Sequence, residues 1–225
     1  MNNFSTRCLA AEFLGSATLT GVVVGSGIAG DSLAPDLPAL ALLCNSLATA
    51  GALYVLITIL GPLSGAHFNP VVTWATWSPL RTQRRQFIVV AVTQTLGCTL
   101  GAIGANLTFS HSVVTLSTHD RTSLAHLVAE GIATAGLLFV ITALGRIHRE
   151  AVIPIAVAIY IGVAYFACSS TSFANPAITI GRMFTDSFAG IAPTSVMPFI
   201  GAQLIGGVIG VQCARYLFIP ESESQ

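Results

Sequence analysis

Residues 65–74, GAHFNPVVTW, bring a histidine, an asparagine and a helix-breaking proline into a chain that is otherwise mostly hydrocarbon. A second Asn-Pro pair lies in residues 171–180, TSFANPAITI. Asn is a favoured helix N-cap, and Pro is tolerated at the first helical position because its missing N–H has no partner there. Each pair therefore predicts a short helix that begins after Asn69 or Asn175.

The surroundings of these motifs indicate a membrane protein. Of 225 residues, 53% are hydrophobic and 8% charged, whereas about 25% are charged in a typical soluble domain. A transmembrane helix needs roughly 20 mainly apolar residues. Six such runs occur, at about 9–30, 37–60, 85–108, 124–145, 151–168 and 194–218. The predicted fold class is an all-α membrane protein with six transmembrane helices.

The chain also contains an internal repeat. AAEFLGSATL, residues 10–19, is echoed by VAEGIATAGL, residues 128–137, which aligns Glu12 with Glu130. Gln94 and Gln203 align further along the two halves. Because each half holds three spans, the second half must enter the membrane from the opposite side, and a site is expected at membrane depth between the halves. We predict a single channel domain, residues 1–225, with inverted repeats of approximately 1–115 and 116–225.

Both Asn-Pro segments fall between spans and are too short to cross a membrane. Each is therefore expected to dip into the membrane as a loop and half-helix, which is tolerated only when buried in protein or lining a watery cavity. The half-helix N-termini would make the centre electropositive. The amides of Asn69 and Asn175 would donate hydrogen bonds to a passing solute, a combination that repels cations and protons.

Other polar residues in the spans receive structural interpretations. Glu12 and Glu130 are expected to accept hydrogen bonds from the backbone of the re-entrant loop in their own half, rather than to relay protons. His67 either lines the pore or braces the loop. Small residues spaced four apart are expected to let helices pack closely; they are Gly97, Gly101, Gly206 and Gly210.

Several function classes are disfavoured. The net charge of zero leaves no basic footprint for nucleic acid. The five cysteines are scattered without metal-ligand spacing, and Gly-x-Ser-x-Gly, His-Glu-x-x-His and P-loop patterns do not occur. We therefore predict no metal site, no cofactor and no enzymatic activity.

The basic residues predict the orientation. All nine are arginines, and with six spans seven of them fall on the side of the N-terminus, leaving Arg121 and Arg182 elsewhere. This asymmetry agrees with the positive-inside rule. Both termini are therefore predicted to be cytoplasmic.

The motifs AAEFLGS, SGAHFNPVV, VTQTLGC, VAEGIATA, FANPAIT and FIGAQLIGG occur in an order that resembles the major intrinsic protein family, the aquaporins and aquaglyceroporins. The resemblance covers nearly the whole chain. It implies two re-entrant half-helices, one pore per subunit, a homotetramer in the lipid bilayer, and passage of small neutral solutes and water.

Two positions depart from the family pattern. The second motif keeps Asn175, Pro176 and Ala177, but the first is Asn69, Pro70 and Val71, where the family usually has Ala. We expect Val71 to be accommodated by repacking rather than to close the pore. In orthodox members an Arg that lines the outer constriction follows the second motif, and here Ile178 stands in its place.

By spacing, the remaining filter positions are Thr49, Ser172 and either Tyr165 or Val163, with Tyr165 preferred. A constriction formed by these residues is less polar than a water filter, which favours glycerol, urea or arsenous acid as the solute. Filters without the arginine also occur in a bacterial branch of the family associated with arsenic resistance, and this sequence resembles that branch. A bacterial inner membrane is the expected location. A water-selective aquaporin and a coupled secondary transporter remain alternatives.

Arg182, four residues after Ile178, either reaches the pore or, as we favour, pairs with Asp186.

Overall fold

The computed structural model describes residues 5–77 and 84–219, and within these ranges every regular element is a helix. Six elements are long and apolar enough to cross a membrane, which confirms the predicted fold class. They are α1 (Thr6–Leu33), α2 (Pro38–Ser64), α4 (Arg84–Thr108), α5 (Leu124–Arg146), α6 (Ile153–Ala167) extended by the 3₁₀ turn η1 (Glu150–Val152), and α8 (Pro193–Leu217).

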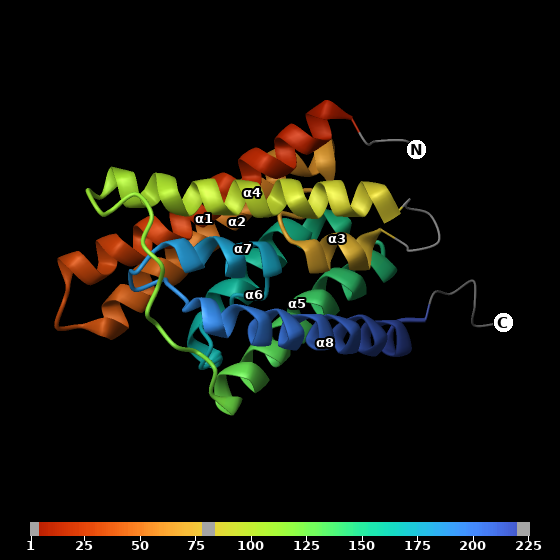
Figure 1. The fold of residues 1–225 in the computed structure, drawn as a ribbon. Helices are drawn as coiled ribbons and strands as arrows, with labels where there is room; N and C mark the ends of the chain where they lie inside the picture. Colours follow the sequence, from red (N-terminus) through yellow and green to blue (C-terminus); the bar gives the residue numbers. More distant parts are fainter. Residues whose placement is uncertain (1–4, 78–83, 220–225) are drawn as a thin grey trace.

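Two short helices lie among these spans (Figure 1). They are α3 (Pro70–Thr76) and α7 (Pro176–Gly181), and each begins directly after its asparagine as predicted. The second half-helix ends at Gly181, where the chain tightens into the 3₁₀ turn η2 (Arg182–Phe184).

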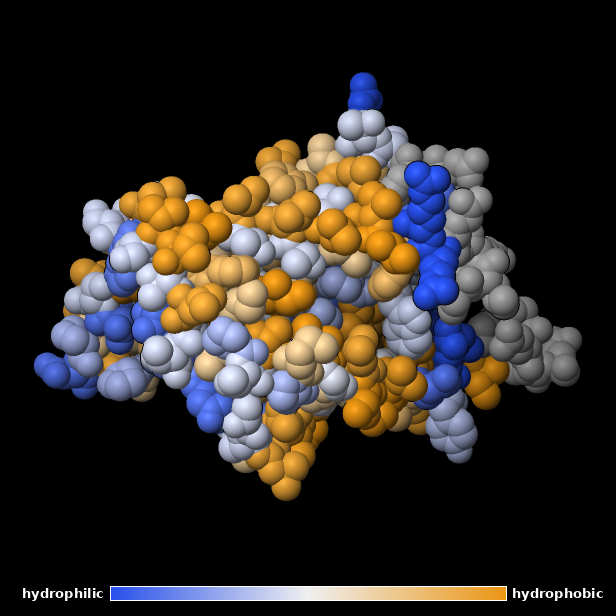
Figure 2. Space-filling model, in the orientation of Figure 1, coloured by the Kyte–Doolittle hydropathy of each residue, from blue (hydrophilic) through white to orange (hydrophobic). Residues whose placement is uncertain are grey.

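The start of α1 and the end of α8 lie at one end of the molecule (Figure 1), here called the terminal side. The segment 109–123, which joins the two halves, crosses the opposite end, the loop side. Hydrophobic residues cover much of the middle of the molecule, and hydrophilic residues gather toward the two ends (Figure 2). This distribution matches a bilayer core flanked by water.

Close backbone packing holds the helices of each half together. A Cβ added at Gly101 of α4 would lie 2.1 Å from the Ala17 carbonyl oxygen of α1, and one at Gly210 of α8 would lie 2.0 Å from the Ala135 carbonyl oxygen of α5. A Cβ added at Gly206 would lie equally close to the Gly131 carbonyl oxygen, at 2.1 Å, and one at Gly97 would lie 2.6 Å from that of Phe13. The packing role predicted for these glycines is confirmed.

The segment 109–123 is anchored on the loop side by Asp186. This carboxylate accepts hydrogen bonds from the Thr118 backbone N–H at 2.8 Å and the Thr118 hydroxyl at 3.1 Å. The Thr118 backbone hydrogen bond holds the pKa of Asp186 below its ordinary value. The anchor is therefore complete at neutral pH and is lost only as the pH falls through that lowered pKa.

Candidate functional site

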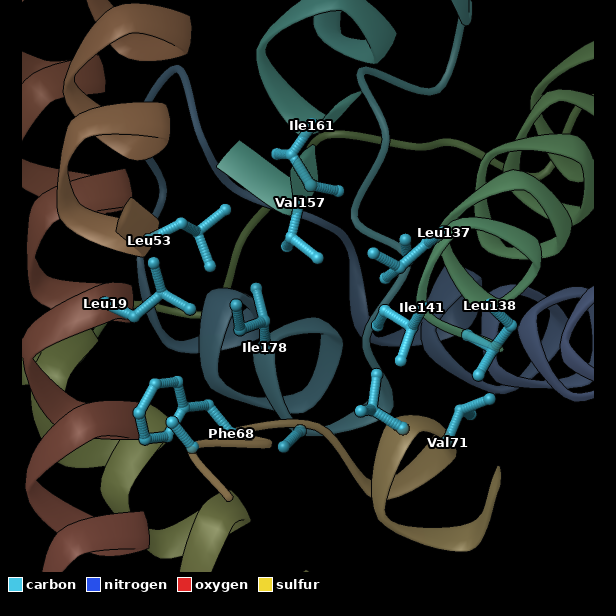
Figure 3. Close-up of a cluster of buried hydrophobic side chains, with 14 of the residues drawn as sticks. Leu19, Leu53, Phe68, Val71, Leu137, Leu138, Ile141, Val157, Ile161 and Ile178 are labelled. Atoms are coloured by element: carbon cyan, nitrogen blue, oxygen red, sulfur yellow. The ribbon is translucent and has the colours of Figure 1, made fainter. Parts of the chain in front are cut away.

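A cavity of about 270 Å³ runs between the two halves. Side chains from α1, α2, α5, α6 and α7 line this central space (Figure 3). The apolar part of its wall includes Leu19, Leu53, Ile141, Val157 and Ile178. The cavity extends from His67 and Thr76, toward the terminal side, to Tyr165 and Arg182, toward the loop side.

Asn69 and Asn175 meet at the middle of this cavity. The Asn69 Oδ1 accepts from the Val71 N–H at 3.0 Å, and the Asn175 Oδ1 accepts from the Ala177 N–H at 2.9 Å, so both cap their half-helices. Each Nδ2 donates across to the other half: Asn69 to the Ala174 carbonyl at 2.7 Å and Asn175 to the Phe68 carbonyl at 2.8 Å. Since an amide carries two N–H groups, each side chain keeps one donor for the cavity that it lines.

The loops before both asparagines share an unusual backbone. Ala66 and Phe68 have φ of 50° and 51°, and their counterparts Ser172 and Ala174 have φ of 52° and 47°. A non-glycine residue in this left-handed region costs about 1–3 kcal/mol, so the surroundings must hold it there. Two residues with this left-handed backbone, Phe68 and Ala174, supply the carbonyl groups that accept the hydrogen bonds from Asn175 and Asn69.

The buried acids supply that support. Glu12 accepts from the backbone N–H groups of His67 at 3.0 Å and Phe68 at 2.8 Å. Glu130 accepts from those of Phe173 at 3.2 Å and Ala174 at 2.5 Å. Each carboxylate thus binds the re-entrant loop of its own half, in the arrangement expected from the repeat.

Two threonines that the sequence reasoning missed extend this network. The Gln94 Nε2 donates to Glu12 at 2.7 Å and to the Thr73 hydroxyl at 2.9 Å. The Gln203 Nε2 makes the same two bonds, at 2.7 and 2.9 Å, to Glu130 and Thr179. The signal was present in the sequence, because both motifs have a threonine four residues after the asparagine.

His67 combines the two roles left open by the sequence. Its ring lines the cavity, while Nδ1 lies 3.2 Å from the Thr73 hydroxyl and Nε2 lies 3.0 Å from the Thr76 hydroxyl. The side chain therefore ties the loop to α3 and also presents a face to the cavity.

The four expected filter positions come together on the wall. Thr49, Tyr165, Ser172 and Ile178 all line the cavity, and the Tyr165 hydroxyl lies 3.0 Å from the Thr49 hydroxyl. Val163, the other candidate on α6, is 60% exposed and faces away. The wall thus combines three hydroxyl-bearing side chains with one aliphatic side chain.

The favoured pairing of Arg182 with Asp186 is wrong. The helical spacing on which it relied is lost, because α7 ends at Gly181 and the backbone at Thr185 is extended. Asp186 binds the segment 109–123 instead. Arg182 is buried on the cavity wall, donates from Nε to the Ala189 carbonyl, and lies with Cζ 3.4 Å from the Phe173 ring centroid.

Arg121 is a further residue whose position the sequence did not predict: it packs on Phe173, which lines the cavity. Its Nε donates to the Gly190 carbonyl at 3.1 Å, and its Cζ lies 5.2 Å from the same Phe173 centroid. No local motif signals this position, because it depends on the path of the segment 109–123. Within the described ranges, no group of three or more side chains is arranged to hold a metal ion.

Val71 is not on the cavity wall. It is buried against α8, in the hydrophobic cluster that contains Leu138 (Figure 3), and its Cγ1 would lie 2.6 Å from a Cβ added at Gly207. Pro70, Pro176 and Ala177 also lie off the described wall, in the first turns of the half-helices. The extra methyl groups of Val71 therefore occupy the space beside Gly207, where a larger residue would have its Cβ.

This contact predicts a paired effect. Gly207→Ala is expected to lower the free energy of unfolding by about 1–3 kcal/mol, because the new methyl overlaps Val71. Adding Val71→Ala should recover most of that loss, as followed by thermal unfolding in detergent. The control is Gly201→Ala on the same helix, where no atom lies within 4 Å of the new Cβ. Equal losses in the single and double variants would contradict the contact.

The sequence is similar to known channel proteins. The sequence model of the major intrinsic protein family matches residues 2–174. Aquaglyceroporin AqpS of Rhizobium meliloti (strain 1021) is 44% identical over 215 residues, which are 96% of this chain and 91% of that protein. Aquaporin-4 of Bos taurus is 31% identical over 231 residues, covering 96% and 69% of the two chains.

A solved structure supports the fold alone. The aquaglyceroporin from Plasmodium falciparum superposes with a TM-score of 0.73 at 21% identity, covering 97% of this chain and 99% of that one. Members of the matched family are passive channels rather than enzymes, and they pass small neutral solutes and water. With six apolar spans and a family match over most of its length, this chain is an integral multi-pass membrane protein that belongs to the major intrinsic protein family.

Proposed function

We propose that this channel conducts small uncharged solutes larger than water, namely glycerol, urea and arsenous acid, and also water. The observation that carries the proposal is the composition of the cavity wall, where the aliphatic Ile178 occurs together with the hydroxyl-bearing Thr49, Tyr165 and Ser172. Hydroxyl groups replace part of a solute's hydration, and the aliphatic side accepts its carbon or metalloid face. A guanidinium at position 178 would occupy that space instead.

Ion exclusion follows from the groups around the same path. Asn69 and Asn175 each retain an N–H donor toward the cavity, and the half-helix N-termini add partial positive charge. The cation of Arg182 stands on the wall beyond them. All of these features repel cations, which favours a channel over a cation-coupled transporter.

We further propose a single channel domain over residues 1–225 with inverted repeats of approximately 1–115 and 116–225, assembled as a homotetramer. The proposed location is the bacterial inner membrane with both termini cytoplasmic. Support for the orientation comes from the arginines of the terminal side, which are Arg7, Arg84, Arg85, Arg146, Arg149 and Arg215. Arg81, which belongs to the same set, lies outside the described residues.

The test is solute flux into proteoliposomes. Stopped-flow light scattering under gradients of glycerol and urea, with uptake of arsenous acid alongside, should show passive flux that is independent of voltage and of a proton gradient. Water permeability alone would support a water-selective aquaporin. Uphill accumulation driven by protons would establish a coupled transporter and end the proposal.

Ile178→Arg should separate solutes by size. We expect glycerol and arsenous acid flux to fall about tenfold, equal to roughly 1.4 kcal/mol in the barrier, because the guanidinium fills the aliphatic side of the constriction. Water flux should fall less. Ile178→Leu, which keeps volume and polarity, is the matched control. An unchanged solute profile in Ile178→Arg would show that position 178 does not limit passage.

A further inference from the structure

Two guanidinium groups pack on the ring of Phe173, a residue that lines the cavity together with Arg182. Arg182 follows the second half-helix, whereas Arg121 belongs to the segment that joins the two halves. Their Cζ atoms lie 3.4 and 5.2 Å from the centroid of one ring, Phe173. The two cations are therefore separated by no more than the sum of these distances.

Neither cation has an acidic partner in the described part of the chain. The hydrogen bonds found for Arg121 and Arg182 use Nε, which donates to the Gly190 and Ala189 carbonyls. No carboxylate of residues 5–77 and 84–219 lies within salt-bridge distance of either group. Glu130 is the buried acid of this half, but its oxygens already accept from Phe173, Ala174 and Gln203.

This arrangement is costly without a ligand. A buried cation without a directly bonded counter-ion is destabilising, and Arg182 is only 3% exposed. The Phe173 ring and the more distant charge of Glu130 offset part of this cost. Two like charges near one ring add repulsion. A bound anion would remove both costs.

A second observation points to the same place. The Ser172 hydroxyl is buried and has no hydrogen-bond partner, although the residue lines the cavity directly before Phe173. The Tyr165 hydroxyl stands on the same wall. An unpaired buried hydroxyl costs about 1–3 kcal/mol until something binds it.

We propose that Arg182, Arg121 and Ser172 form a binding site for a monovalent oxyanion, such as a carboxylate or a group of similar size, at the outer constriction. Guanidinium groups match the paired oxygens of such an anion, and the Ser172 hydroxyl donates to it. Between this level and the two asparagines the wall includes aliphatic side chains such as Ile178 and Leu53, so an anion that moved inward would lose its guanidinium contacts. The anion is therefore held at the constriction, where it obstructs neutral solutes. The proposal rests on the proposed channel function and adds an inhibitory site to it.

The first experiment uses methanesulfonate, an oxyanion that has no neutral form at working pH. Labelled glycerol uptake is measured at constant osmolarity and ionic strength, with sodium methanesulfonate replacing sodium gluconate on both sides of the membrane. We expect saturable inhibition of uptake in the wild type. Methanesulfonamide, the neutral isostere, should inhibit far less at the same concentration.

Variants identify the residues. Arg182→Gln and Arg121→Gln should each raise the half-inhibitory concentration about tenfold, whereas Arg149→Gln, an exposed arginine on the terminal side, should leave it unchanged. Thermal unfolding in detergent gives a readout that does not need transport, because a ligand that binds only the folded state raises the midpoint. Methanesulfonate should raise the midpoint of the wild type and of Arg149→Gln but not that of Arg182→Gln.

The outcomes separate this proposal from the channel function. Glycerol uptake without inhibition or thermal stabilisation would leave the channel standing and overturn the anion site, so that the arginines serve only to repel cations. Thermal stabilisation by methanesulfonate without any glycerol flux would support the site and overturn the proposed solute. Equal inhibition by the neutral isostere would also overturn the site.

Discussion

Gly101→Ala is expected to remove most of the folded channel from the membrane. The new methyl carbon would lie 2.1 Å from the Ala17 carbonyl oxygen and 3.0 Å from the Gly21 nitrogen. Both are backbone atoms of α1, so no side-chain rotation relieves the overlap and the two helices must separate. We expect a destabilisation of about 3 kcal/mol or more, at or above the upper end of the usual cost of overpacking. Folded protein extracted by detergent should then fall several-fold, as measured by size-exclusion chromatography.

The same helix supplies the control. Gly104 has no atom within 4 Å of an added Cβ, so Gly104→Ala should give the wild-type yield. In the second half, Gly210→Ala and Gly201→Ala form the equivalent pair, because only Gly210 approaches a backbone carbonyl. If Gly101→Ala and Gly104→Ala gave equal yields, close contact between α1 and α4 would not be needed for folding.

Glu130→Gln is expected to damage both stability and conduction. The carboxylate accepts from the Phe173 and Ala174 backbone N–H groups and from Gln203, and a glutamine turns one of these acceptor oxygens into a donor. Each buried donor that loses its acceptor costs about 1–3 kcal/mol. The left-handed backbone at Ser172 and Ala174 then loses its support. We expect a clearly lower unfolding midpoint and about a tenfold loss of glycerol flux per folded channel, equal to roughly 1.4 kcal/mol.

The matched control is Glu150→Gln, which removes an exposed acid from η1. It should change neither measurement. A wild-type midpoint and flux in Glu130→Gln would mean that the carboxyl group is protonated in the native channel and acts as a neutral acceptor and donor.

Features with a local chemical cause were predictable from the sequence. The spans follow from apolar runs of membrane length, and the starts of the half-helices follow from an asparagine cap with proline at the first position. The buried acids were placed on the re-entrant loops because the repeat aligned Glu12 with Glu130. In each case a short segment carries its own signal.

Features that depend on the path of the chain were not predictable in this way. The pairing of Arg182 with Asp186 assumed that α7 continues, whereas the helix ends at Gly181. Arg121 reaches Phe173 because long-range hydrogen bonds hold its segment, from Thr118 to Asp186 and from Arg121 itself to Ser195. Val71 was known to add bulk, but the glycine that receives it lies far along the chain on α8.

The exchange of hydrogen bonds between Asn69 and Ala174, and between Asn175 and Phe68, has an evolutionary consequence. Each half completes its own motif only by using the other, so neither half is self-sufficient. A gene encoding one half, inserted into the membrane in both orientations, would form the same two bonds between copies of itself. Duplication and fusion of such a gene would then allow each copy to diverge. Val72 and its counterpart Ile178, both on the cavity wall, show the benefit of a fused chain: two copies of one sequence would carry the same residue at both positions.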